Sequence, residues 1–164
     1  MKILKTLNVK TPTRGTEVAA GIDFFVPEKS EDFVKYFFEK NPDVLITDEG
    51  IILNPHQRVN IPSGIKAEIP KGYALIAYNK SGVSLKYGLD VGATVVDEDY
   101  QGMIHLSLVK TSDKTIIINY GQKIIQFLLI PIFYDKVELV NNEEELFTRD
   151  SQRGEGGFGS TGIK

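Results

Sequence analysis

The recurrence of short apolar segments between turn-forming residues constrains the fold more than any other feature of the sequence. Segments rich in Ile, Val, Tyr and Phe alternate with Gly, Pro, Asn and Asp along most of the 164 residues. These segments span residues 51–53, 58–61, 65–69, 73–78, 94–96, 103–109, 115–118, 124–133 and 137–139. Strands this short and this closely spaced predict an all-β sandwich or barrel.

Turn residues support the all-β prediction. Residues 62–64 (Pro-Ser-Gly) and 70–72 (Pro-Lys-Gly) each place a proline of fixed φ before a conformationally free glycine. Gly121 has a similar role before residues 124–130, an apolar run interrupted by Gln126. We expect that run to be a strand buried on both faces, in part by another subunit.

Composition excludes several classes of protein. The length favours a single domain over residues 1–164, and the 19 Lys and Arg are scattered among 22 Asp and Glu, which disfavours broad nucleic-acid binding. We expect a soluble, cytoplasmic protein, because no apolar run reaches the roughly 18 residues of a membrane span and no signal-peptide core is present. Without Cys, and with only His56 and His105, catalysis must rest on carboxylates, hydroxyls, amides, cations or an oxygen-bound metal.

One segment departs from the β pattern and predicts a short helix over residues 30–40. Ser30 is a good N-cap before an acidic first turn, and a proline follows the segment. The apolar residues at helical spacing are Phe33, Val34, Phe37 and Phe38. We expect this stripe to pack on the barrel. The alternatives are a docking surface for a protein partner or a wall of the active site.

The glycine-rich tail is the most specific of five clusters that suggest chemistry. Within residues 153–162, glycines leave backbone amides accessible to phosphates. Arg153 can make forked contacts to phosphate oxygens, and Phe158 offers a face for stacking on a flat ring. We predict a mobile lid over a nucleotide at about residues 150–164, with a frayed terminus as the alternative.

The second cluster, residues 88–102, predicts a hairpin. Its main chain can present N–H and C=O groups to a base edge, while its turn holds Asp97 and Tyr100 nearby. A surface turn rich in Asp and Gly is the simpler alternative.

The remaining clusters are weaker individually. In residues 79–86, Lys80, Ser81 and exposed amides suit a phosphate, although an ordinary helix cap explains Ser81 equally well. Residues 19–23 end in an aspartate that could simply cap a turn, and residues 121–126 end in a glutamine that could be a satisfied buried amide.

Together the five clusters resemble, in their order, the five motifs of the trimeric dUTP pyrophosphatases, the dUTPase family. The resemblance covers about residues 11–162, apart from an insertion at about residues 28–49. It implies a homotrimer of distorted jelly-roll β-barrels, with three sites at subunit boundaries. It also implies Mg²⁺-dependent hydrolysis of dUTP to dUMP and pyrophosphate, which keeps uracil out of DNA and supplies dUMP for dTTP synthesis.

The same resemblance implies a role for each matching residue. Asp97 would orient and activate the attacking water, Gln126 would help to hold that water, and Asp23 would reach magnesium through its water shell. Tyr100 would lie under the deoxyribose and exclude a 2′-hydroxyl. The substrate-binding residues would be Lys80, Ser81, Gly82, Ala93, Thr94, Val95, Tyr100, Arg153, Phe158, Gly159, Ser160 and Thr161.

Some residues depart from the family pattern. Lys80 replaces the usual Arg of the second motif, which exchanges a forked contact for a point charge. Thr94 stands where a Gly is common, and residues 122–123 (Gln-Lys) replace an acidic-basic pair. Two other functions therefore stay open: a dCTP deaminase, which shares this barrel, and a nucleotide-gated regulatory protein that binds a partner through the insertion.

Overall fold

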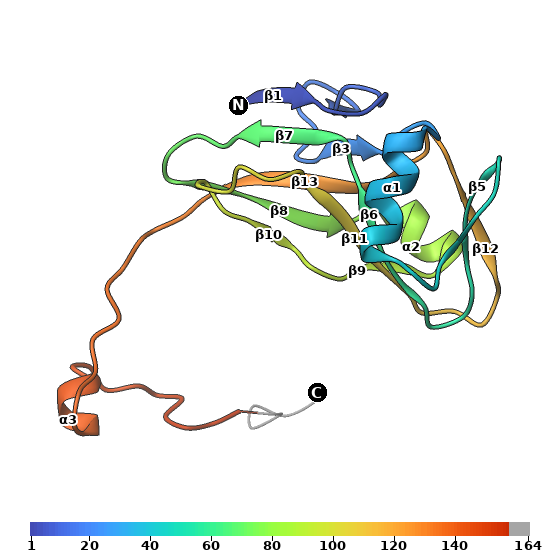
Figure 1. Cartoon of the computed structure of the whole chain (residues 1–164). Helices are drawn as coiled ribbons and strands as arrows, with labels where there is room; N and C mark the ends of the chain where they lie inside the picture. The colour runs from blue at the N-terminus through green and yellow to red at the C-terminus, as the bar shows by residue number, and fades with distance from the viewer. Residues whose placement is uncertain (158–164) are drawn as a thin grey trace. The chain divides into compact units, whose positions relative to one another are not determined.

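A computed structural model describes residues 1–157 of the chain (Figure 1). The chain divides into two compact units, one comprising residues 1–133 and the other beginning at Tyr134. Every strand in the described part belongs to the first unit, which confirms the all-β prediction with a short helical insertion. None of the helices within residues 1–157 has the length and apolar character needed to cross a membrane.

The helices and strands are short, as the sequence predicts. In chain order they are β1 (Lys2–Lys5), β2 (Thr13–Arg14), β3 (Ile22–Phe25), α1 (Glu31–Lys40), β4 (Leu45–Ile46), β5 (Gly50–Leu53), β6 (Arg58–Pro62), β7 (Ile65–Glu68), β8 (Tyr73–Asn79), α2 (Ser81–Tyr87), β9 (Leu89–Val91), β10 (Val95–Val96), β11 (His105–Lys110), β12 (Ile116–Asn119), β13 (Lys123–Pro131) and α3 (Glu143–Leu146). Positive φ angles at Gly64, Gly72 and Gly121 confirm the three turns that the sequence predicts.

The largest sheet has five strands in the order β10-β8-β13-β3-β2. Its central pair, β8 and β13, is antiparallel and runs in register from Asn79 opposite Ile125 to Tyr73 opposite Pro131. Two three-stranded sheets, β6-β11-β9 and β12-β5-β4, and the ribbon β1-β7 complete the first unit. The five-stranded sheet positions most of the candidate site residues.

Alternation along these strands directs the larger apolar side chains into the core. Phe24 of β3 and Phe127 of β13 are buried, and their ring centroids lie 4.6 Å apart. Ile125 is also fully buried, whereas Leu128 to Ile130 are only half-buried. The expected burial of β13 on both faces therefore holds within this chain only for its first half.

Helix α1 is an integral part of the core. Ser30 caps it, since the Phe33 backbone N–H donates to the Ser30 hydroxyl at 3.1 Å. Phe33 and Phe37 are fully buried, and the Phe33 ring meets Tyr120 edge-on with centroids 5.7 Å apart. Packing of the aromatic stripe on the strands is thus confirmed for these two residues, while Phe38 remains 40% exposed.

Asn41 ends α1 and attaches it to the sheet. Its side-chain amide nitrogen donates to the carbonyls of Phe37 at 2.7 Å and Asn60 at 3.0 Å, and its amide oxygen accepts from the Asn60 backbone N–H at 2.7 Å. These three bonds satisfy a buried polar side chain at the point where the helix stops.

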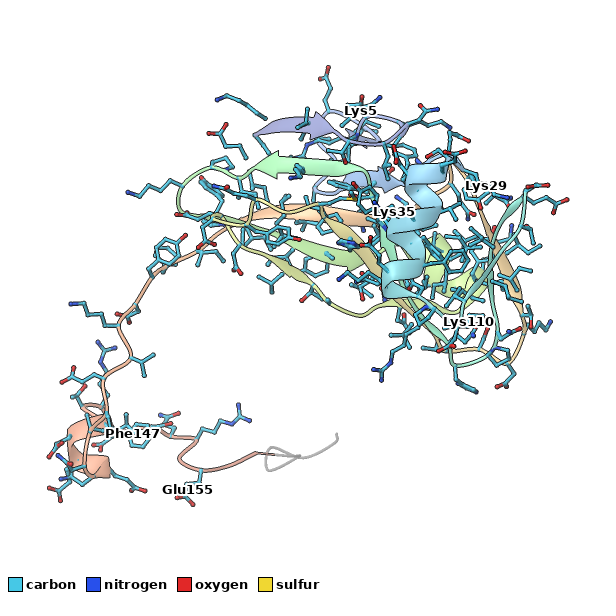
Figure 2. All side chains as sticks on the ribbon, viewed as in Figure 1. Lys5, Lys29, Lys35, Lys110, Phe147 and Glu155 are labelled. Atoms are coloured by element: carbon cyan, nitrogen blue, oxygen red, sulfur yellow. The ribbon has the colours of Figure 1, made fainter. Side chains whose placement is uncertain are left out.

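Two features differ from the sequence analysis or were missed by it. Residues 137–139, predicted as a strand, have no strand structure, and Val137 and Leu139 are fully exposed. An extended segment needs a neighbouring strand to bond its backbone groups, and the described residues provide none here. Lys110 (Figure 2) is fully buried, with its ammonium bonded to the Ser112 hydroxyl and to the Ser112 carbonyl at 3.0 Å.

Candidate active site

One pocket of about 410 Å³ gathers four of the sequence-predicted residues around two lysines. We call it the lysine pocket, and it is lined by Lys80, Ser81, Gly82, Val83, Tyr87, Lys123 and Gln126. The residues come from α2 and its N-cap and from the first part of β13. Clusters that are about 40 residues apart in sequence therefore meet because β8, which leads into α2, pairs with β13.

The start of α2 presents polar groups to the lysine pocket. Lys80 occupies the N-cap position and provides no side-chain cap, so Ser81 is the first helical residue and not the cap. Ser81 and Gly82 are exposed, and backbone N–H groups in a first helical turn have no partner within the helix. A hydroxyl, free amides and a cation are therefore available together to an anionic ligand.

Asp23 holds the two lysines of the pocket. It lies in β3 opposite Gln126, is 4% exposed, and accepts hydrogen bonds from Lys80 on Oδ1 and from Lys123 on Oδ2, the latter at 3.0 Å. Burial raises the pKa of Asp23, but the hydrogen bonds from Lys80 and Lys123 outweigh it and hold the pKa below its usual value. The carboxylate is therefore charged and fixes both ammonium groups.

Lys123 was not identified as a site residue from the sequence. The available signal was its place within residues 121–126, three positions before Gln126. A register shift in the pairing of β13 with β3 falls between Lys123 and Ile125. Such an irregularity can redirect a side chain that regular alternation would place on one face.

The geometry does not fit the expected contact of Asp23 with hydrated magnesium. Each of its carboxylate oxygens is already bonded to an ammonium group, and the residue is buried. Residues 1–157 contain no group of three or more His, Asp or Glu side chains arranged to hold a metal ion.

Gln126 is fixed between two backbone segments. Its Nε2 donates to the Asn79 carbonyl at 2.9 Å. On the other side lies Gly21, where an added Cβ would come within 2.1 Å of Gln126 Oε1. Only glycine at position 21 leaves room for this amide, which explains the glycine of the segment that ends in Asp23.

A second pocket of about 180 Å³ contains most of the predicted hairpin residues. We call it the hairpin pocket, and it is lined by Asn60, Ala93, Val95, Val96, Asp97, Tyr100, Ile104, His105, Ser107 and Phe127. Tyr100 Oη donates to the Met103 carbonyl at 3.0 Å, and His105 Nδ1 lies 2.9 Å from the same oxygen. Burial lowers the pKa of His105, so its ring is neutral at neutral pH.

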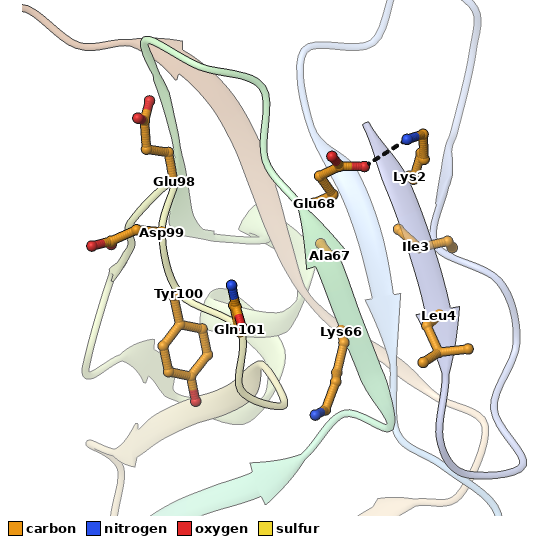
Figure 3. A pocket seen from close by; sticks show the side chains of 10 residues that line it. All are labelled: Lys2, Ile3, Leu4, Lys66, Ala67, Glu68, Glu98, Asp99, Tyr100 and Gln101. Atoms are coloured by element: carbon orange, nitrogen blue, oxygen red, sulfur yellow. Dashed lines mark ion pairs between the residues drawn. The ribbon is translucent and has the colours of Figure 1, made fainter.

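Two further pockets border the hairpin. Thr94 lines one of them together with Asn79 and Val91, and its carbonyl accepts from the Ala77 backbone N–H at 2.7 Å. Tyr100 also lines a pocket of about 440 Å³ between the 98–101 turn and the β1-β7 ribbon (Figure 3). Cations and carboxylates both line that last pocket, so it has no single charge preference.

Within one chain, the lysine pocket and Asp97 are well separated. Val96 pairs with Leu75 and Gln126 with Tyr78 of the same strand, β8. Asp97 follows Val96, so it lies four residues along the strand direction and two strand spacings away from Gln126. With about 3.3 Å per residue and about 4.8 Å per strand, the separation is roughly 16 Å. One chain therefore does not bring the predicted catalytic pair together.

The tail residues belong to the second unit or lie beyond the described part. Arg153 is exposed, and its Nε donates to the Gly156 carbonyl at 2.6 Å. Four predicted ligands lie outside the described residues: Phe158, Gly159, Ser160 and Thr161.

A family model described as dUTPase matches residues 43–162, which is most of the chain. The chain belongs to the dUTPase family. It is 38% identical over 124 residues to the deoxyuridine 5'-triphosphate nucleotidohydrolase of Hydrogenobaculum sp., covering 74% of this chain and 83% of that protein. It is 37% identical over 154 residues to the enzyme of the same name from Paramecium bursaria Chlorella virus 1, covering 93% and 90%.

Solved dUTPase structures share the fold. A Gly-to-Ser mutant of the dUTPase of Staphylococcus bacteriophage 80alpha, determined with dUpNHpp, superposes with a TM-score of 0.74 at 22% identity and covers 99% of this chain and 98% of that one. A variant dUTPase from phage phi11 of S. aureus, described with a structural Mg(II) ion, gives a TM-score of 0.65 at 21% identity over 87% and 97%. The dUTPase fold predicted from the motifs is thus confirmed.

Proposed function

We propose that the chain hydrolyses dUTP to dUMP and pyrophosphate as a homotrimer whose sites lie at subunit boundaries. The observation that carries the proposal is the division of the site residues between two pockets, with Asp97 roughly 16 Å from Gln126 in one chain. The lysine pocket has cations and amide donors without Asp97. The hairpin pocket has Asp97 without cations. A second copy that places its hairpin against the lysine pocket completes the set.

The lysine pocket supplies the groups for the triphosphate. The Ser81 hydroxyl and the Gly82 amide donate to phosphate oxygens, and Lys80 and Lys123 provide positive charge next to them. Magnesium enters as part of the Mg–dUTP substrate, and when bound it reduces the negative charge that an attacking water must approach. Asp23 acts through the lysines that it holds.

The hairpin supplies the water-activating carboxylate and the nucleoside contacts. Asp97 accepts a proton from a water that attacks the α-phosphorus in line. The bond between the α-phosphorus and the oxygen that bridges it to the β-phosphate breaks, and pyrophosphate leaves with that oxygen. Gln126 of the adjoining copy holds that water. Tyr100 packs under the deoxyribose, and the main chain of Ala93 to Val95 reads uracil.

The C-terminal tail closes the site in this proposal. Arg153 meets the terminal phosphate, Phe158 stacks on uracil, and Gly159, Ser160 and Thr161 supply further phosphate donors. Closure excludes bulk water, which strengthens the electrostatic contacts to the phosphates. In a cell the reaction removes dUTP before it enters DNA and supplies dUMP for dTTP synthesis, so we place the enzyme in the cytoplasm.

Pyrophosphate release from Mg-complexed dUTP, dTTP, dCTP and UTP tests the reaction directly. Strong preference for dUTP supports the proposal. Release of ammonia from dCTP would indicate the deaminase reaction that shares this barrel.

Subunit mixing tests the shared site. We expect D97N and Q126A proteins to be inactive alone but to regain about a quarter of the wild-type sites when refolded together at equal amounts, since one site in four then combines both intact residues. The control is D97N protein refolded in the same way without Q126A, which should stay inactive because every site then lacks Asp97. Absence of recovery, in mixed trimers verified by native mass spectrometry, would place the complete site within one chain.

A regulatory partner at residues 28–49 is a second proposal, supported by the partial exposure of Tyr36 and Phe38 on α1. Deleting the insertion cannot test it, because the deletion also removes the buried Phe33 and Phe37. The Y36S/F38S protein keeps the buried Phe33 and Phe37 and loses only the edge-on contact of Phe38 with Phe37. It should hydrolyse dUTP normally and lose the binding of any regulator that the wild-type enzyme binds.

A further inference from the structure

Asn79 forms hydrogen bonds to β13, its neighbour in the five-stranded sheet, and to β9, a strand of another sheet. It is the last residue of β8 and immediately precedes Lys80. Its backbone carbonyl accepts from Gln126 Nε2 at 2.9 Å. Its side chain accepts from the Val91 backbone N–H at 2.7 Å and donates to Asp90 Oδ1 at 2.8 Å.

The Asp90 carboxylate extends this network to the helix of the lysine pocket. Its Oδ1 also accepts from the Ser84 hydroxyl at 3.0 Å. Ser84 lies one turn after Ser81 in α2, while Asp90 lies in β9, the strand that leads into the hairpin. Asn79 and Asp90 therefore join β13, α2 and β9 through four hydrogen bonds, of which two are to a carboxylate and are correspondingly strong.

We propose that Asn79 is a positioning residue for dUTP hydrolysis: in each copy it fixes the start of α2 and the Gln126 amide, which serve one site, and the strand that enters the base-reading hairpin, which serves the neighbouring site. The inference rests on the proposed function. Asn79 need not touch the nucleotide, because a small displacement of positioned groups is enough to reduce a rate by up to about 10²-fold.

The chemistry of the side chain suits this role. A carboxamide places one acceptor and one donor group on a single plane, which matches the Val91 N–H on one side and the Asp90 carboxylate on the other. Alanine would remove the acceptor of the Val91 N–H and would leave the Asp90 carboxylate with the Ser84 hydroxyl alone. Aspartate would keep the acceptor for Val91 but would place a second negative charge against Asp90.

A swap of the two side chains provides the sharpest experiment. We expect N79A to lose about tenfold in kcat/KM for dUTP and to discriminate less between dUTP and dTTP. N79D should be at least as defective. The double variant N79D/D90N restores one carboxylate and one carboxamide in exchanged positions, so it should recover both the rate and the base preference. N119A alters another asparagine at the end of a strand, outside all four pockets, and should match the wild type.

All constants are measured at a temperature where circular dichroism shows each variant folded. Unchanged kcat, KM and base preference in N79A would overturn the positioning role. If N79A does not fold, the comparison of N79D with N79D/D90N decides, and equal defects in both would overturn it. A wild-type protein that does not hydrolyse dUTP would instead refute the proposed function itself, before any variant is compared.

Discussion

The lysine pocket and the hairpin pocket are proposed to serve one reaction, yet they are built in different ways. In the lysine pocket, the buried Asp23 fixes the charged groups, and the Lys80 side chain is only 21% exposed. In the hairpin, Ala93, Thr94 and Val95 are exposed, and bonds such as that from the Ala77 N–H hold the main chain. The first depends on which side chains are present, and the second on the path of the backbone. Substitutions should therefore be less costly in the hairpin, except where a side chain performs chemistry.

The largest effect is expected at Asp97, the hairpin side chain that is proposed to perform chemistry. D97N removes the proton acceptor of the hairpin pocket while preserving its shape, so kcat for dUTP should fall by about 10²–10⁴-fold. Binding of the non-hydrolysable dUpNHpp, measured by calorimetry, should be unchanged. Turnover at the wild-type rate would show that the base lies elsewhere.

Among the residues that support the lysine pocket, Asp23 is the one whose substitution should weaken dUTP binding most. D23N removes the charge that holds Lys80 and Lys123, and a lost charge-assisted hydrogen bond of about 1.5 kcal/mol raises KM for dUTP about tenfold. D113N is the matched control. Asp113 is exposed, and its carboxylate lies 3.4 Å from the exposed His56 ring. Equal KM values in the two variants would show that the lysines do not need this anchor.

The same substitution should alter stability in acid. The lowered pKa of Asp23 means that its contribution to stability is complete above the ordinary carboxyl pKa of 3.8 and is lost as the pH falls through the lower folded value. Below about pH 4 the wild-type protein should therefore lose more stability than D23N as the pH falls, as measured by urea unfolding. Parallel curves for the two proteins would remove Asp23 as a source of the acid sensitivity.

K123Q tests whether the second lysine contributes to phosphate binding. Lys123 is half-exposed, with 53% of its side chain accessible, so solvent screens its charge. We expect KM for dUTP to rise about threefold, with kcat unchanged, and the difference to shrink in high salt. A KM that does not respond to salt would assign Lys123 to holding Asp23 alone.

The smallest effect is expected for T94G in the hairpin. Position 94 has no positive φ, so threonine is unstrained there although the family commonly has glycine. If the backbone reads the base, T94G should change the preference for dUTP over dTTP by less than about twofold. The variant should also be slightly less stable, because glycine gives the unfolded chain more freedom. A larger gain in selectivity would show that the threonine side chain narrows the base pocket.

Local features of the fold could be predicted from the sequence. The Ser30 cap, the buried Phe33 and Phe37 and the strand predicted over residues 73–78 depend on neighbouring residues. The cap and the burial agree with the prediction, and the strand extends one residue further, to Asn79. Residues 137–139 have the same local pattern, yet they form no strand. Strand structure requires a partner, which the pattern of one segment cannot supply.

Much of the candidate site depends on pairing between distant segments. The order of the motifs predicted that Asp97 and Gln126 act on the same water, but the strand register separates the two residues within one chain. Spacing likewise gave no indication that Lys123 would reach Asp23 or that Asn79 would meet Asp90. Such contacts follow from register and side-chain direction, which a single sequence does not determine.

The burial of Phe33 and Phe37 has a consequence for how the insertion moves. Amide hydrogens exchange with solvent when a segment opens, and a segment that shares its core with the strands opens only when they do. The N–H groups in the last turn of α1 should therefore exchange in heavy water as slowly as those of β6. In energetic terms, the insertion and the strands form one cooperative unit.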